Sequence, residues 1–152
     1  MDACRALNRR LMVAVNRMDG FYYSWARRSG LSSHTLALLY ALDDGLPHSQ
    51  KQIAQEYLIP KTTLNTVVKA CQEAGYLTLQ AMPDRPRQRR LCLTGAGRDY
   101  ARRALEDLYR AEDAAMAATL ERFPAQAVEA MEYYAAQLRA AYGQNILEKK
   151  EP

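Results

Sequence analysis

The sequence lacks any apolar run long enough to cross a membrane. No stretch of about 18 apolar residues, the length of a spanning helix, occurs in the chain. The first residues, MDACRALNRRLM, mix charged and apolar side chains instead of placing an apolar block behind a charged end, which argues against a signal peptide. We therefore expect a cytoplasmic protein that makes no membrane contact.

Residues that build catalytic and metal sites are also scarce. The chain has two histidines, which have no partners nearby in the sequence, and it contains no GxSxG, HExxH or P-loop motif. Its three cysteines, Cys4, Cys71 and Cys92, are widely spaced and form no CxxC pair, which argues against a disulfide framework and a zinc site. We predict that the protein is not an enzyme and needs no metal or cofactor.

What the chain does have is a concentrated positive charge. The formal net charge of the 152 residues is +4. Residues 61–90 hold six basic and two acidic side chains, so this segment carries the entire excess and the remainder is neutral. A local basic segment of this kind is typical of a surface that binds an anionic partner such as nucleic acid.

Apolar residues at alternating steps of three and four predict long amphipathic helices at both ends of the chain. The first runs from about Asp2 to Arg28, with Gly30 placed to stop it, and a second lies between Ser32 and Gly45. An Ala-rich helix from Thr94 to about Leu120 and a final helix beginning at Pro124 complete this set.

A shorter pattern occupies the middle. Ser49 and Gln52 form a capping box that opens a short helix, while Pro60 and Gly75 are placed to start and stop the next one. Apolar residues then recur at every second position in YLTLQAM and RLCL, which predicts two short strands separated by PDRPRQR. The predicted order is ααααββαα, in which a capped helix, a turn, a second helix and an arginine-rich hairpin form a winged helix-turn-helix.

The helix at residues 60–75 has two different faces. One face is apolar, and the other presents Thr and Asn side chains, which can hydrogen-bond base edges or phosphates, together with lysines at phosphate positions. Arginine side chains are favoured in a narrow minor groove. A DNA duplex that receives the helix in its major groove and the hairpin in its minor groove would therefore account for both elements. The alternatives are an ordinary solvated helix face and arginines that merely keep the hairpin soluble. The predicted apolar set is Leu64, Val67, Val68 and Cys71, and the predicted DNA-contacting set is Gln50, Lys51, Lys61, Thr62, Thr63, Asn65, Thr66, Lys69, Arg85, Arg87 and Arg89.

The segment SQKQIAQEYLIPKTTLNTVVKACQEAGYL, followed by a hairpin that ends in LCLTGAG, resembles the MarR family of bacterial transcriptional regulators. The resemblance implies a mainly α fold with a small β-hairpin, in which residues 31–95 form the DNA-binding module. Residues 1–30 and 120–152 would form the dimerisation region, and residues 95–120 a connecting helix. A homodimer of this kind reads a pseudo-palindromic operator in double-stranded DNA and most often represses transcription.

The hairpin departs from the family pattern. The family commonly has Asp-x-Arg or Asp-Arg-Arg before the Leu-Thr pair, whereas this chain inserts Pro86 and extra arginines. Either Arg85 or Arg87 fits the family's minor-groove arginine, and Arg90 is expected on the other face of the strand, where it would pair with Asp84.

The resemblance also implies a regulatory ligand, a small aromatic or phenolic anion that releases DNA. Aromatic residues at helical spacing are candidates for lining its cleft, although such residues are commonly core. The candidates are Tyr22, Tyr23, Trp25, His34 and Tyr40. Two alternatives are a redox regulator that senses peroxide through Cys4, beside Arg5, and a winged-helix module that binds an acidic protein instead of DNA.

Overall fold

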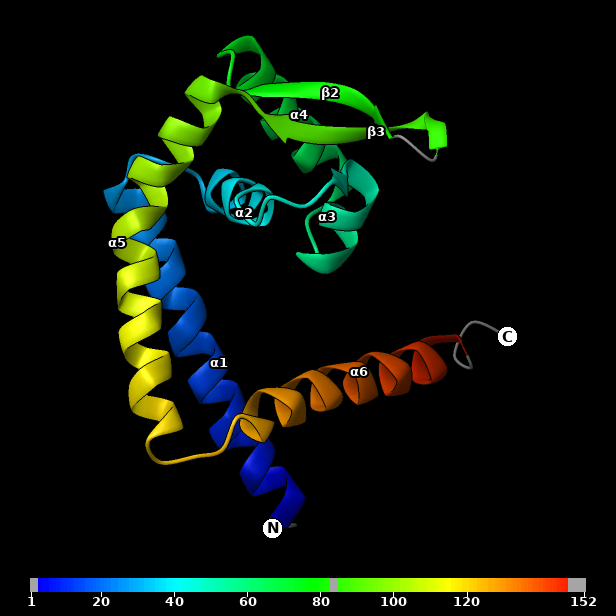
Figure 1. Cartoon of the computed structure of the whole chain (residues 1–152). Helices are drawn as coiled ribbons and strands as arrows, with labels where there is room; N and C mark the ends of the chain where they lie inside the picture. Colours follow the sequence, from blue (N-terminus) through cyan, green and yellow to red (C-terminus); the bar gives the residue numbers. More distant parts are fainter. Residues whose placement is uncertain (1–2, 83–84, 148–152) are drawn as a thin grey trace. The chain divides into compact units, whose positions relative to one another are not determined.

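The computed structural model describes residues 3–82 and 85–147, with the side chains of residues 82–88 and 144–147 outside the description. Two compact units make up the chain, residues 1–108 and 109–152. No helix within the described ranges is both long enough and apolar enough to span a bilayer. The elements, traced in Figure 1, are α1 (Ala3–Arg28), α2 (Ser33–Leu42), β1 (His48–Ser49), α3 (Gln50–Glu56), α4 (Lys61–Glu73), β2 (Leu77–Met82), β3 (Arg85–Leu93), α5 (Gly95–Leu120) and α6 (Gln126–Leu147).

The helix ends lie where local chemistry predicts them. The Ser32 side chain accepts a hydrogen bond from the Thr35 amide at the start of α2. Gly30, Gly45 and Gly75 all have positive φ, a conformation that a residue without a Cβ adopts at little cost. The fold is mainly helical with a small antiparallel sheet, as the sequence predicts.

The sheet differs from the predicted hairpin in two ways. A two-residue strand, β1, joins its edge and gives the order β1-β3-β2, with Ser49 paired to Arg90. The second strand also starts earlier than expected, at Arg85, so most of the predicted loop PDRPRQR is strand. Register shifts from Ala81↔Arg89 to Met82↔Arg85, and this bulge takes up Pro86, which cannot donate to a ladder.

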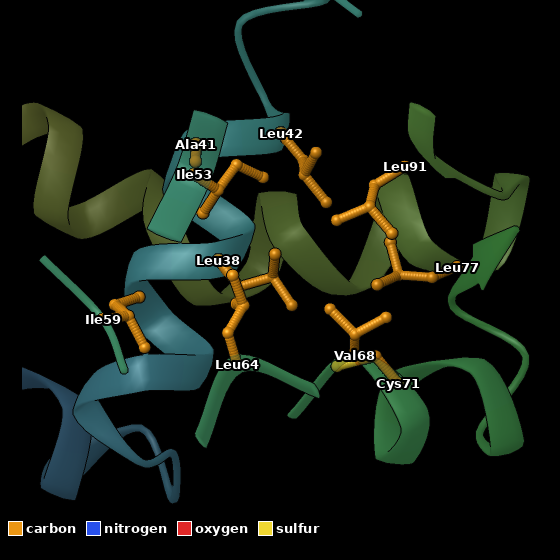
Figure 2. Close-up of a cluster of buried hydrophobic side chains, with 10 residues drawn as sticks. All are labelled: Leu38, Ala41, Leu42, Ile53, Ile59, Leu64, Val68, Cys71, Leu77 and Leu91. Atoms are coloured by element: carbon orange, nitrogen blue, oxygen red, sulfur yellow. The ribbon is translucent and has the colours of Figure 1, made fainter. Parts of the chain in front are cut away.

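The core of the first unit lies where α2, α3, α4 and the sheet meet, and Figure 2 shows its buried side chains pointing toward one another. Leu38, Ile53 and Leu64 are completely buried, and Leu91 almost so. Each fully buried side chain of this type contributes on the order of 1.5–3 kcal/mol, so the cluster fixes the helix-turn-helix on the sheet. The full cluster is Leu38, Ala41, Leu42, Ile53, Ile59, Leu64, Val68, Cys71, Leu77 and Leu91.

The long helices contribute little to this core. Ala26 is the buried residue of α1, and none of the described side chains of α6 is buried. Several large apolar side chains on these helices face solvent in the single chain, such as Phe21 at 74%, Leu138 at 52% and Tyr142 at 67% exposure. Apolar surface of this extent on a helix is unusual without a partner.

The start of α5 approaches the end of α4 closely. Thr94 caps α5, because its Oγ1 accepts a hydrogen bond from the Gly97 amide at 2.9 Å, and it donates to the Gly75 carbonyl at 2.7 Å. A Cβ at Gly97 would lie 2.0 Å from the carbonyl oxygen of Tyr76, whereas one at Gly95 would meet nothing within 4 Å. The junction between the hairpin and α5 therefore needs glycine at position 97.

Gly97→Ala is expected to lower the free energy of unfolding by about 1–3 kcal/mol or more, because the added methyl group overpacks a backbone contact that cannot relax. Urea denaturation measures the change. Gly95→Ala in the same helical turn is the matched control and should leave stability equal or slightly raised. Equal stability of the two variants would contradict the close approach.

Candidate functional site

The helix-turn-helix is held by a complete capping box. The Ser49 side chain accepts from the Gln52 amide at 3.2 Å, and the Gln52 side chain accepts from the Ser49 amide at 2.8 Å. Leu58, in the turn that follows α3, has a φ of 50°, which is uncommon for a residue with a side chain. The turn then closes with the Ile59 amide donating to Ala54, so α4 leaves α3 in a defined direction.

The polar face of α4 is exposed, as its spacing predicts. Thr62, Asn65 and Thr66 face solvent on the side opposite to the buried Leu64 and Val68. Thr66 Oγ1 donates to the Thr62 carbonyl at 3.1 Å, which orients one hydroxyl group along the helix. These three side chains form a continuous strip of short hydrogen-bonding groups.

Asn65 is linked to the helix before it. The side-chain amide of Gln50, the first residue of α3, donates to Oδ1 of Asn65. This contact directs the NH₂ group of Asn65 away from α3, where it can act as a donor. Gln50 therefore orients the central side chain of the strip.

Basic side chains flank the strip. Lys51 and Lys61 are exposed, and Thr63 is half-buried. Lys69 is exposed and lies 3.8 Å from Glu73, a surface ion pair of little energetic weight. Pro60 gives α4 no side-chain cap, so the first amides of this helix are available to an anion.

The wing contributes arginines from β3. Arg89 is exposed, while Arg90 is half-buried and its Nη2 donates to Oε1 of Gln80 at 3.0 Å. The two residues lie on opposite faces of the strand, as expected from alternation. The side chains of Arg85 and Arg87, and Asp84 as a whole, lie outside the described residues. Gln80 is thus a described partner of Arg90, and the expected pair of Arg90 with Asp84 lies outside the described residues.

A mainly apolar cavity of about 350 Å³ lies in the first unit. Two of the predicted ligand residues, Tyr22 and Tyr40, line it. Sequence reasoning missed the other lining residues, although Asp19 lies one helical turn before Tyr22 and Leu36 one turn before Tyr40, so their spacing carried a signal. The missed residues are Asp19, Ser33, Leu36, Ala37, Tyr57 and Leu108.

The other three predicted ligand residues are not among those lining this cavity. The indole N–H of Trp25 donates to the Ala104 carbonyl at 3.4 Å and so ties α1 to α5. The Tyr23 ring lies beneath the Arg27 guanidinium, 5.9 Å away, and His34 is exposed.

Two ionisable groups near these features have raised pKa values. Burial, followed by the charges of Glu56 and Asp44, raises the pKa of Tyr57. Burial also raises the pKa of Cys71, which disfavours the reactive thiolate there. Cys4 is exposed on α1. Among the described residues no cluster of His, Cys, Asp and Glu is arranged to hold a metal ion.

A capped helix, a tight turn, a second helix with an exposed polar face and an arginine-bearing hairpin are therefore all present. Residues 29–89 match the model of the MarR family. This segment is similar to the MarR family. No curated protein sequence matches the chain.

Solved structures extend the likeness beyond the MarR segment. NMB1585, a MarR family regulator from Neisseria meningitidis, has a TM-score of 0.74 and 24% identity, covering 99% of this chain and 100% of its own. The transcriptional regulator BldR from Sulfolobus solfataricus has a TM-score of 0.68 and 16% identity, covering 90% and 99%. NadR in complex with 4-hydroxyphenylacetate has a TM-score of 0.66 and 15% identity, covering 87% and 91%.

The chain thus has the fold of a MarR-family transcriptional regulator. NMB1585 and BldR, which share this fold, are described as regulators of transcription.

Proposed function

We propose that this protein is a homodimeric, sequence-specific DNA-binding repressor. The observation that carries the proposal is the exposed strip Thr62, Asn65 and Thr66 on α4, which faces away from the buried Leu64 and Val68. Short donors and acceptors of this kind match base edges in the major groove. Residues 31–95 would form the DNA-binding module, and the eleven residues predicted from the sequence to contact DNA remain the proposed contact set.

The charges around the strip support separate roles for phosphate contacts and base contacts. Lys51, Lys61 and Lys69 surround it at positions suited to phosphates, and the uncapped start of α4 adds free amides. Arg89 on the wing is exposed for a neighbouring minor groove, where arginine is favoured. Phosphate contacts would set the orientation, and the α4 strip would select the sequence.

The exposed apolar surface supports the dimer. Residues 1–30 and 120–152 are proposed to pair with a second copy, with residues 95–120 as the connecting helix. Phe21 on α1 and Leu138 and Tyr142 on α6 are exposed in the single chain, and they would be buried on dimerisation. A two-fold axis would place two α4 helices about one turn of DNA apart, roughly 34 Å.

Selection of genomic DNA fragments bound by the purified protein tests the proposal as a whole. The expected result is enrichment of inverted half-sites centred about 10 base pairs apart, because a two-fold dimer reads its operator symmetrically. Affinity should also fall by orders of magnitude from low to moderate salt, as for other proteins that neutralise several phosphates. Binding without any sequence enrichment would instead favour a module for acidic protein partners.

Asn65→Ala is expected to cost on the order of 1–3 kcal/mol at the selected operator and to relax preference at one base position, because a bidentate amide contact is lost. Competition binding against operator variants measures both effects.

Gln50→Ala should give a smaller loss at the same position, since Asn65 keeps its contact but loses its orientation. Gln55→Ala, an exposed glutamine on α3, is the matched control. Unchanged discrimination in Asn65→Ala would contradict the role given to this side chain.

We infer that the cavity lined by Tyr22 and Tyr40 takes a phenolic ligand that weakens DNA binding. The tyrosine and leucine side chains suit an aromatic ring, and the Asp19 carboxylate is suited to accept from a phenolic hydroxyl group. NadR, which has the same fold, forms a complex with 4-hydroxyphenylacetate. Such a ligand would act by favouring a conformation in which the two α4 helices no longer match the operator.

A panel of phenolic acids, including 4-hydroxyphenylacetate, is expected to raise the melting temperature and lower operator affinity. Stabilisation of about 2.7 kcal/mol is expected at a ligand concentration 100 times Kd. Tyr22→Ala should reduce the effect, while Tyr23→Ala, its neighbour outside the cavity lining, should preserve it. A panel that changes neither quantity would remove the support for this ligand.

A further inference from the structure

A second cavity, of about 240 Å³, lies at the base of the wing. Its walls are the loop between α2 and β1, the last residues of β3 and Arg98 in the first turns of α5. The strand β1 pairs with β3 only at Leu91 and Arg90, so the loop takes the place of a strand beside Cys92 and Leu93. The cavity is therefore a gap at a sheet edge, separate in its lining from the one containing Tyr22 and Tyr40.

Two arginines, Arg90 and Arg98, are among the residues that line this cavity. Arg98 Nη1 donates to the Leu93 carbonyl at 3.0 Å, which holds the group at the strand edge. Neither arginine forms a salt bridge within the described part of the chain. Asp43 also lines the cavity, so the formal charge of its walls is positive by one.

Only some of the hydrogen-bond donors of Arg90 have partners among the described residues. Its Nη2 donates to Gln80, but its Nε is shielded from solvent and has no hydrogen-bond partner among the described residues. Because the Nε is shielded from solvent, a molecule in the open cavity cannot reach this atom. An acceptor in the cavity would bind the other N–H groups of this guanidinium.

The rest of the wall is apolar. Leu42, Leu46, Pro47 and Leu93 line the cavity together with the two arginines. Its volume is below the range of about 300–1,000 Å³ that is usual for drug-sized ligands. Inorganic phosphate would leave the apolar wall without a contact, and a nucleotide would exceed the space.

We propose that this cavity binds a small organic monocarboxylate. The carboxylate lies between Arg90 and Arg98 and accepts charge-assisted hydrogen bonds, for which a planar guanidinium fork is well matched. The compact apolar body of the ligand packs on Leu46 and Pro47. The site does not depend on the proposed repressor function, because its recognition involves none of the residues assigned to DNA or to the phenolic cavity.

Isothermal titration of the full-length protein with sodium isobutyrate, at an ionic strength held constant with chloride, tests the site. Isobutyrate should bind the natural protein, and Arg98→Gln and Arg90→Gln should each weaken binding roughly tenfold or more, because each removes a charged donor. Arg102→Gln, an exposed arginine one helical turn beyond Arg98, should bind like the natural protein. Absence of binding, equal binding by Arg98→Gln, or tighter binding of inorganic phosphate would overturn the proposal.

Amide chemical shifts in an NMR titration locate the ligand independently of any variant. Isobutyrate is expected to move the signals of Gly45, Leu46 and Leu93, which lie at the cavity wall. Shifts confined to the neighbourhood of Tyr22 and Tyr40 would overturn the proposal, because they would place the carboxylate in the other cavity.

Discussion

Burial of the apolar side of α4 is the constraint on which the proposed interface depends. Leu64 is completely buried, and Val68 and Cys71 are nearly so, against α2 and the sheet. Because an α-helix repeats every 3.6 residues, fixing these positions also fixes the direction in which Thr62 and Asn65 point. The core therefore sets the rotation of the helix, and the link to Gln50 adds a direct restraint on Asn65.

Local chemistry made much of this arrangement predictable from the sequence. The Ser49 and Gln52 capping box and Gly75 mark helix ends through contacts within a few residues. The strand β1 was missed, because two residues carry no period and their pairing partner lies more than 40 positions away. The early start of β3 was missed because Pro86 indicates a loop, while the bulge that accommodates it arises only in the paired sheet.

In the candidate sites too, local sequence predicted some residues, and tertiary packing determined the others. Periodicity located the α4 strip, but the Gln50 link to Asn65 depends on how two helices cross in space. In the aromatic cavity, Tyr22 and Tyr40 were predicted, whereas Tyr57 joins them only through tertiary packing. Trp25 was a reasonable candidate by spacing, yet its indole N–H is used by a backbone carbonyl of α5, a contact 79 residues away in the sequence.

The pairing register of β3 determines which arginine faces the wing surface and which faces the small cavity. Arg89 is exposed on the wing, and the next residue, Arg90, turns toward Gln80 and the small cavity. A slip of one residue would exchange these two faces, so the register must be fixed. Pairing of Ser49 with Arg90 supplies one such restraint, and Ser49 is also the cap of α3. A single residue thus ties the start of the helix-turn-helix to the alternation of the wing arginines, which explains why so short a strand as β1 matters to the interface.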